Sequence, residues 1–213
     1  MITPNRLPLT LLSSLALVFM LVGCSNPADD VTTAKTTAAV ETDAAASDVA
    51  ATIFVTNEAS TVGFTGSKVT GSHDGGFKTF TCELAVADGK LIAAGSVVEI
   101  DMASTWSDAE KLTKHLKSAD FFDTEKFPTA GFTFTSVGVG EDDMPAITGN
   151  FDFHGVTKSI SFPATIEISD TAVTLKTEFS INRGDFNIKY PGKTDDLIRD
   201  EVVIRLDLAA APK

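Results

Sequence analysis

Hydrophobic and polar residues alternate along most of the chain beyond residue 52. The pattern is clearest in Gly149–Pro163, where Phe151 and Phe153, and then Ile160 and Phe162, occupy every second position on either side of a short Gly-containing loop. Period-two alternation around such a loop predicts a β-hairpin with one apolar and one polar face. A hairpin cannot bury its apolar face alone, so further strands must close around it.

The same alternation recurs often enough to predict about eight strands and a closed sheet. We expect strands at Ile53–Asn57 and Thr61–Val69, which are interrupted at Glu58–Ser60, and at Phe77–Ala87, Lys90–Met102, Gly131–Val139, Ile147–His154, Lys158–Ile168, Asp170–Ile181 and Val202–Leu208. Alternation on nearly every strand favours antiparallel sheet that faces water on one side. The predicted fold class is mainly β: an antiparallel eight-stranded lipocalin-like barrel with one short helix, whose interior can hold one small ligand.

The connections between these strands carry their own signals. Asp88-Gly89 predicts a tight hairpin turn. Gly71–Gly76 and Arg183–Asp196 have the composition of loops. The apolar period changes to three and four over Ser107–Ala119, which predicts a helix of roughly ten residues capped by Ser107 or Asp108.

The first 51 residues are typical of an exported, membrane-anchored protein. Arg6 precedes an apolar run, Leu9–Val22, and the segment Leu21–Cys24 resembles a bacterial lipobox. We therefore expect a signal peptide at 1–23, lipid on Cys24, and a disordered tether rich in Ala, Thr and Ser over 24–51, followed by the folded domain at 52–213. Ser25, where an Asp resembles an inner-membrane retention signal, favours the outer membrane, facing the periplasm. The alternative is an ordinary secretory signal with an incidental cysteine.

Charge and cysteine content exclude some partners. The chain has 213 residues and a net charge of −12, which disfavours long-range attraction to nucleic acid and to anionic headgroups. With Cys24 assigned to lipid, Cys82 has no partner for a disulfide, and its place on the apolar side of an alternating run predicts a buried, inert thiol.

Three ordered motifs resemble a known family. They are Lys114–Asp123 followed by Lys126–Ala130, then Ile147–Phe151 with His154–Lys158, and finally Phe179–Phe186. Together they resemble the YceI-like family of bacterial periplasmic proteins over nearly the whole folded domain. The resemblance implies a lipocalin-like barrel that binds a polyisoprenoid or similar long-chain lipid in its pore. That family is usually exported in soluble form, so the lipobox is a departure that concerns location and not the pocket.

The content of phenylalanine fits an apolar guest. The chain has 15 Phe but one Trp and one Tyr, and Phe supplies apolar area without a polar group that needs a partner. The alternative is that these rings pack against each other as ordinary core. From the alternation, the candidate lining residues are Phe64, Phe80, Leu84, Ile100, Leu116, Phe121, Phe132, Phe134, Phe151, Phe153, Phe162, Phe179 and Ile204.

Four polar residues are candidates for contacts with a ligand headgroup at the pore mouth. They are His115, His154, Arg183 and Asp185, for which loop and cap hydrogen bonding is the alternative. We find no nucleophile elbow, Gly-rich phosphate loop or paired-carboxylate motif, and the three His lack metal-ligand spacing.

The sequence therefore predicts a non-enzymatic envelope lipoprotein. It would bind, sequester or transport a long-chain lipid, with no catalytic residues, no metal, and no cofactor beyond a bound isoprenoid or quinone. A quinone- or lipid-modifying enzyme and a solid interaction scaffold are the competing hypotheses, and a homodimer is also left open.

Overall fold

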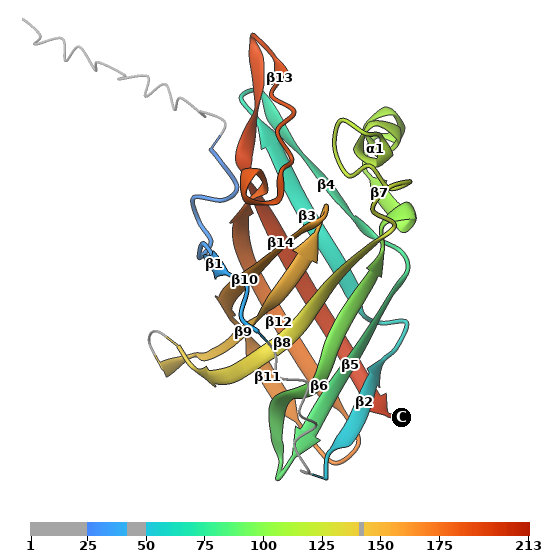
Figure 1. The fold of residues 1–213 in the computed structure, drawn as a ribbon, viewed down its shortest axis with the longest axis vertical. Coiled ribbons are helices and arrows are strands. Elements are labelled where there is room, and N and C mark those ends of the chain that lie inside the picture. The colour runs from blue at the N-terminus through green and yellow to red at the C-terminus, as the bar shows by residue number, and fades with distance from the viewer. Residues whose placement is uncertain (1–24, 42–49, 141–142) are drawn as a thin grey trace, which may run out of the picture.

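The computed structural model describes residues 25–41, 50–140 and 143–213 of the chain (Figure 1). The predicted signal peptide at 1–23 and the predicted lipidation site Cys24 lie outside the described residues. The described part is mainly β, with one α-helix, α1 (Glu110–Lys117), and two short 3₁₀ turns, η1 (Met102–Ser104) and η3 (Arg183–Phe186). None of its helices has the length and apolar character that crossing a membrane requires.

The strands account for most of the described chain. They are β1 (Lys35–Ala38), β2 (Thr52–Thr56), β3 (Thr61–Lys68), β4 (Gly71–Phe77), β5 (Phe80–Ala87), β6 (Lys90–Asp101), β7 (Thr105–Ser107), β8 (Thr129–Val139), β9 (Pro145–Phe153), β10 (Val156–Pro163), β11 (Thr165–Ile168), β12 (Val173–Asn182), β13 (Gly192–Lys193) and β14 (Asp196–Pro212).

Eight long antiparallel strands close into a barrel. Three pairs of strands, β2 with β3, β4 with β5 and β10 with β11, continue one another across short breaks, and each pair acts as one long strand. The eight long strands are then, in chain order, β2/β3, β4/β5, β6, β8, β9, β10/β11, β12 and β14. Each is hydrogen-bonded to the next, and β14 is hydrogen-bonded to β2 and β3, which closes the barrel (Figure 1). The predicted antiparallel barrel is confirmed, although the described residues form fourteen separate strands where the sequence predicts eight.

Two tight turns follow from residues that tolerate positive φ. Asp88 and Gly89, with φ of 51° and 71°, join β5 to β6, as the sequence predicts. His154 and Gly155, with φ of 52° and 74°, join β9 to β10 in the same way. Two successive positive values are typical of the type I′ turn, whose twist matches that of paired strands. The short Gly-containing loop predicted within Gly149–Pro163 is therefore two residues long.

The predicted loop at Gly71–Gly76 is wrong, because this segment forms strand β4. Its glycines permit close approach: a Cβ on Gly75 would lie 2.4 Å from Cζ of Phe64 and 2.6 Å from the carbonyl oxygen of Trp106. The absence of side chains lets β4 pair with β3 and β7 at once. In the second predicted loop, Arg183–Asp196, the chain instead forms η3 and the hairpin of β13 and β14.

The predicted disordered tether is wrong for residues 26–40, which we call the N-terminal strap. Ala28 and Ala34 are buried, and strand β1 within the strap pairs with β10. The backbone also exchanges two hydrogen bonds with Ser180 of β12, and Val40 exchanges two with the side-chain amide of Asn150. The strap thus fills the gap where β10 and β12 diverge. The strap is ordered by backbone hydrogen bonds. Its sequence contains few apolar residues, so its composition alone does not predict this order.

Candidate functional site

The barrel encloses a cavity of about 150 Å³. Its wall is built from β3, β6, β8, β9, β10, β12 and β14, and the loop after α1 closes over it. The surface that faces the cavity is entirely apolar, although Arg183 and Arg199 are among the lining residues. An apolar cavity of this volume is large enough for a benzene-sized group and stays free of water.

The structure places eleven of the thirteen predicted lining residues on the cavity wall. Nine of them project inward because alternation puts every second side chain of a barrel strand on the inner face, whereas Leu116 of α1 and Phe121 of the following loop cover the cavity from outside the strands. The eleven residues are Phe64, Ile100, Leu116, Phe121, Phe132, Phe134, Phe151, Phe153, Phe162, Phe179 and Ile204.

Phe80 and Leu84 do not line the cavity, and their assignment was wrong. Leu84 is wholly buried but pairs with Phe54 of β2, and neither residue belongs to the cavity wall. Phe80 follows the break between β4 and β5 and is only half-buried. Alternation predicts the face of a strand on which a residue lies, but not its height along the barrel.

Several lining residues were missed by the sequence analysis. Ile147, Leu175 and Leu208 are wholly buried on the wall, and Phe122 covers it from the loop after α1. The alternation that identified their neighbours could have found the first three. For Phe122, which lies outside any strand, no periodic signal exists.

Arg183 reaches the cavity wall but is committed to the protein itself. Its side chain is 5% exposed, and its guanidinium donates to the carbonyl oxygens of Arg199 (3.0 Å), Ile188 (2.9 Å) and Ile198 (3.3 Å). One Nη also lies 2.9 Å from the Asp200 carboxylate. Burial lowers the pKa of Arg183, against the opposing effect of Asp200. These bonds fasten β14 to η3, so the geometry gives Arg183 a structural role instead of the predicted headgroup contact.

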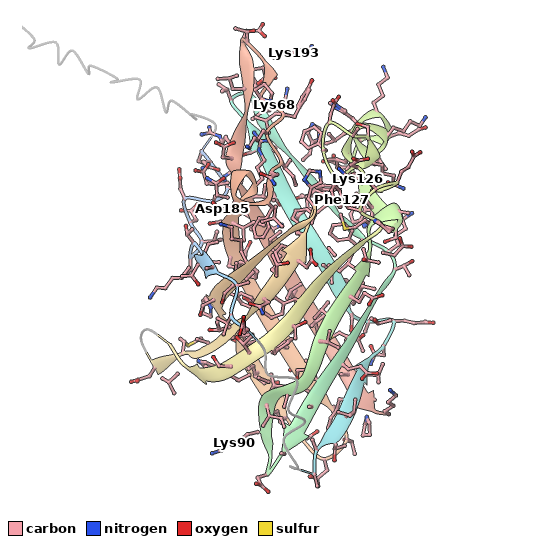
Figure 2. All side chains as sticks on the ribbon, viewed as in Figure 1. Lys68, Lys90, Lys126, Phe127, Asp185 and Lys193 are labelled. Atoms are coloured by element: carbon pink, nitrogen blue, oxygen red, sulfur yellow. The ribbon has the colours of Figure 1, made fainter. Side chains whose placement is uncertain are left out.

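The other three predicted headgroup residues do not line the cavity. The ring of His115 packs edge-on at 5.0 Å against Phe121, which does line it. Nδ1 of His154 lies 3.1 Å from the carbonyl oxygen of Phe186, which makes Nδ1 the donor. Asp185 is exposed on η3 (Figure 2). The structure therefore does not bring these four residues together as a polar mouth.

Arg199 is the polar residue that the sequence analysis missed. It contributes to the wall of the cavity next to Ile198, near the start of β14. Its Nε is buried and has no hydrogen-bond partner. A buried donor without an acceptor costs about 1–3 kcal/mol, but Nε does not face the cavity, so a ligand acceptor could meet it only if the side chain moved.

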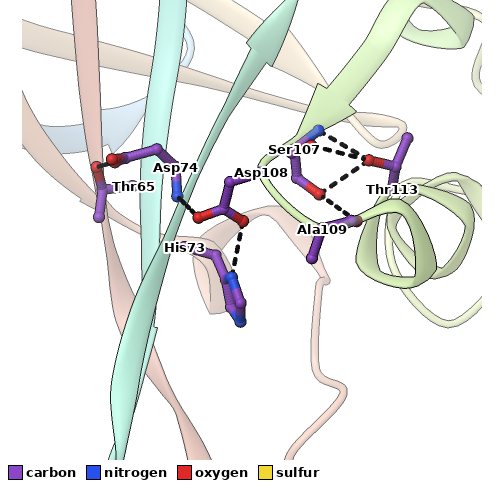
Figure 3. A network of polar contacts seen from close by, with 7 residues as sticks. All are labelled: Thr65, His73, Asp74, Ser107, Asp108, Ala109 and Thr113. Carbon is purple, nitrogen blue, oxygen red and sulfur yellow. Dashed lines mark hydrogen bonds and ion pairs between the residues drawn. The ribbon is translucent and has the colours of Figure 1, made fainter.

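A polar network beside α1 contains a histidine, an aspartate and a serine but is not arranged for catalysis (Figure 3). Nδ1 of His73 lies 2.8 Å from Asp108, whose second oxygen accepts from the backbone N–H of Asp74. Ser107 instead bonds to Thr113, 2.9 Å between hydroxyl oxygens, and has no bond to the histidine. The network ties β4 to the start of α1. The predicted side-chain cap by Ser107 or Asp108 is wrong, because the helix begins after Ala109 without one.

The remaining candidate groups for chemistry are inert or dispersed. Cys82 is wholly buried, and burial, with a smaller effect of Glu83, raises the pKa of its thiol to about 12. The predicted buried thiol is confirmed. Within residues 25–41, 50–140 and 143–213, no three His, Cys, Asp or Glu side chains are grouped to hold a metal.

Comparisons with a family model, a curated relative and two solved structures agree with the family resemblance of the sequence motifs. The model of the YceI-like domain family matches residues 54–210. A UPF0312 protein of Pseudomonas putida (strain F1) is 36% identical over 130 residues, covering 58% of this chain and 68% of that protein. BcnA of Burkholderia cenocepacia superposes with a TM-score of 0.65 at 21% identity, covering 73% of this chain and 99% of that one. A polyisoprenoid binding domain from Saccharophagus degradans, implicated in plant cell wall breakdown, superposes with a TM-score of 0.62 at 17% identity, covering 77% and 100%. At these identities the two structures show a shared fold.

Proposed function

Because the chain belongs to the YceI-like domain family and its barrel encloses a wholly apolar cavity, we propose that it binds the hydrocarbon chain of an isoprenoid or similar long-chain lipid. The cavity carries the proposal. Each buried CH₂ contributes about 0.8 kcal/mol, so a five-carbon isoprene unit contributes roughly 4 kcal/mol before the entropic costs of binding. The polyisoprenoid binding domain of Saccharophagus degradans, which shares the fold, supports an isoprenoid as the guest.

Arg199 is the residue that we expect to meet a polar headgroup. After a movement of the side chain toward the cavity, its unpartnered Nε–H could donate to a carbonyl oxygen of a quinone or to a phosphate oxygen. Arg183 is already bonded to three carbonyl oxygens and one carboxylate, which leaves it little capacity for a ligand. The headgroup would thus lie at the upper end of the cavity and the hydrocarbon below it.

The sequence adds a location to this proposal. A lipobox that ends at Cys24 supports an envelope lipoprotein, anchored to the outer membrane and facing the periplasm. In that position the barrel would sequester or carry lipid next to the membrane. The apolar wall offers no nucleophile or acid–base pair, which favours a carrier over an enzyme.

Mass spectrometry of the purified protein tests the lipid and the anchor separately. Native spectra and organic extraction should show a co-purified isoprenoid that leaves unchanged. A chemically altered lipid would indicate an enzyme, and an empty protein that takes up no added prenyl lipid would refute the proposal. For the anchor, Cys24→Ala should abolish acylation of the N-terminal peptide, whereas Cys82→Ala should retain it.

A further inference from the structure

The N-terminal strap fixes where the chain leaves the barrel. The side-chain oxygen of Asn26 lies 3.4 Å from the hydroxyl of Ser67, near the upper end of β3, and Ala28 is buried. Only Ser25 separates Asn26 from Cys24, and two peptide units span at most about 7–8 Å. A lipid on Cys24 would therefore hold this end of the barrel, and not a distant one, at the membrane.

The same end exposes apolar side chains. The turn between β3 and β4 and the hairpin of β13 and β14, residues 66–71 and 189–198, form what we call the upper tip (Figure 1). Val69 is 53% exposed and Leu197 is 50% exposed, and the N–H of Val69 donates to the carbonyl oxygen of Leu197 at 3.1 Å. Two large aliphatic side chains thus lie next to each other on adjoining backbones. Such residues suit insertion among lipid headgroups.

Charge distinguishes the upper tip from the rest of the molecule. It carries three lysines and two aspartates, for a net charge of +1 in a chain of −12. Lys68 forms an ion pair with Asp196, and Lys193 projects from the extremity of the tip (Figure 2). Attraction to anionic headgroups therefore acts on this end, whereas the remainder of the chain repels them.

Neither of the other turn-bearing ends combines these features. At the opposite end, where Lys90 lies (Figure 2), the turns at 88–89 and 169–172 expose no large apolar side chain. The hairpin between β8 and β9 exposes Val139 and Met144, but Glu141–Asp143 between them are all acidic. The cavity, moreover, ends beneath the upper tip, since Gly66 and Ile198 belong to both.

We propose that the upper tip rests on the membrane surface, with Val69 and Leu197 among the headgroups, so that the cavity exchanges lipid directly with the bilayer. The inference rests on the proposed function, because it needs the lipid on Cys24. It adds the orientation of the barrel and the surface that contacts the membrane.

Site-specific fluorescence on the acylated full-length chain tests the orientation. Single cysteines at Val69, Leu197, Val139 and Lys90 would be labelled with an environment-sensitive fluorophore, since Cys24 is blocked by acylation and Cys82 is buried. The proteins would be bound to vesicles of three parts phosphatidylethanolamine to one part phosphatidylglycerol. We expect a several-fold rise in intensity with a blue shift at Val69 and Leu197, and no change at Lys90.

Each other outcome overturns the proposal. A shift at Val139 alone would identify the β8–β9 hairpin as the contact, and no shift at any site would show that the barrel stands away from the bilayer. Mass spectra of the same samples report acylation and bound lipid. Bound lipid without a shift at the tip refutes the orientation and leaves the proposed function intact, whereas loss of acylation removes the basis of both anchor and orientation.

A functional variant gives a second readout. Val69→Glu combined with Leu197→Glu should slow transfer of a fluorescent prenyl lipid from these vesicles several-fold. The amount bound at saturation should stay unchanged, because neither side chain lines the cavity. Equal transfer rates for the variant and the unmodified protein would count against uptake through the tip.

Discussion

Replacing Leu208 with Asn separates binding in the cavity from stability of the barrel. Leu208 is wholly buried on the cavity wall, and Asn has a similar shape but carries an amide. The amide makes this part of the cavity polar enough to hold a water molecule, and a bound hydrocarbon would displace that water and leave the amide without a hydrogen bond, at a cost of about 1–3 kcal/mol. Since every 1.4 kcal/mol is tenfold, affinity for a prenyl lipid should fall roughly 5- to 140-fold.

Leu84→Asn is the matched control for this substitution. Leu84 is also wholly buried in the barrel but does not line the cavity. Both variants should lose stability, on the order of 2–5 kcal/mol as for other truncations of buried leucine, measured by urea unfolding. Displacement of a fluorescent prenyl probe should then show weaker binding only for Leu208→Asn. Equal affinity loss in both, or full affinity in a folded Leu208→Asn variant, would refute the reasoning. If either fails to fold, Val62→Thr on the wall and Val86→Thr away from it provide a gentler pair.

Three further predictions concern the frame of the barrel and its guest. Gly75→Ala should destabilise by about 1–3 kcal/mol in urea, because its Cβ would meet a phenylalanine ring at 2.4 Å, whereas Gly66→Ala, with open space around it, should not; equal effects would contradict this. A hydrogen bond from Lys68 is the main cause that holds the pKa of Asp196 below its ordinary value of 3.8. The ionised carboxylate therefore stabilises the fold above pH 3.8, and this stabilisation is lost as the pH falls through the lowered pKa. Unfolding should therefore show Asp196→Asn as less stable than the unmodified protein at pH 7 and equal to it well below pH 3.8. In fluorine NMR of fluorophenylalanine-labelled protein, added prenyl lipid should shift the resonance of Phe122 more than that of Phe162. Phe162 is stacked at 4.1 Å on Phe179, whereas Phe122 makes looser contacts, and the reverse order would contradict this difference in packing.

The wall of the cavity was predictable because alternation is a local property of the sequence. Ile100 on β6 and Phe162 on β10 lie on the apolar side of their own strands, whatever those strands pair with. The turn at Asp88-Gly89 is equally local, because only its own residues need to adopt positive φ. The side of a strand on which each residue lies, and the strands that each tight turn joins, can therefore be inferred from short stretches of sequence. Together they predict the barrel.

What escaped prediction depends on residues far apart in the chain. The N-terminal strap is ordered by Ser180 and Asn150, more than a hundred residues away, and its Ala- and Thr-rich composition alone resembles a flexible tether. Gly75 fits into its strand only because it has no side chain, since the ring of Phe64 packs where a Cβ would be. The role of Arg183 was invisible for the same reason, since its acceptors are carbonyl oxygens, which any residue supplies.

The volume of the cavity determines how a long lipid can be held. About 150 Å³ accommodates a group the size of benzene, which is close to one isoprene unit, so a longer chain must displace side chains of the wall. Phe162 and Phe179 are stacked at 4.1 Å with an interplanar angle of 6° on strands held by backbone pairing, and moving them would break close contacts. Phe64, Phe77 and Phe122 instead meet in tilted or edge-on contacts with centroids 5.8–6.3 Å apart, and Phe122 belongs to the loop after α1. Looser contacts lose less dispersion energy when they open. A chain longer than one isoprene unit should therefore extend from the cavity into this cluster, and the freedom of the loop after α1 should limit the length that the barrel accepts.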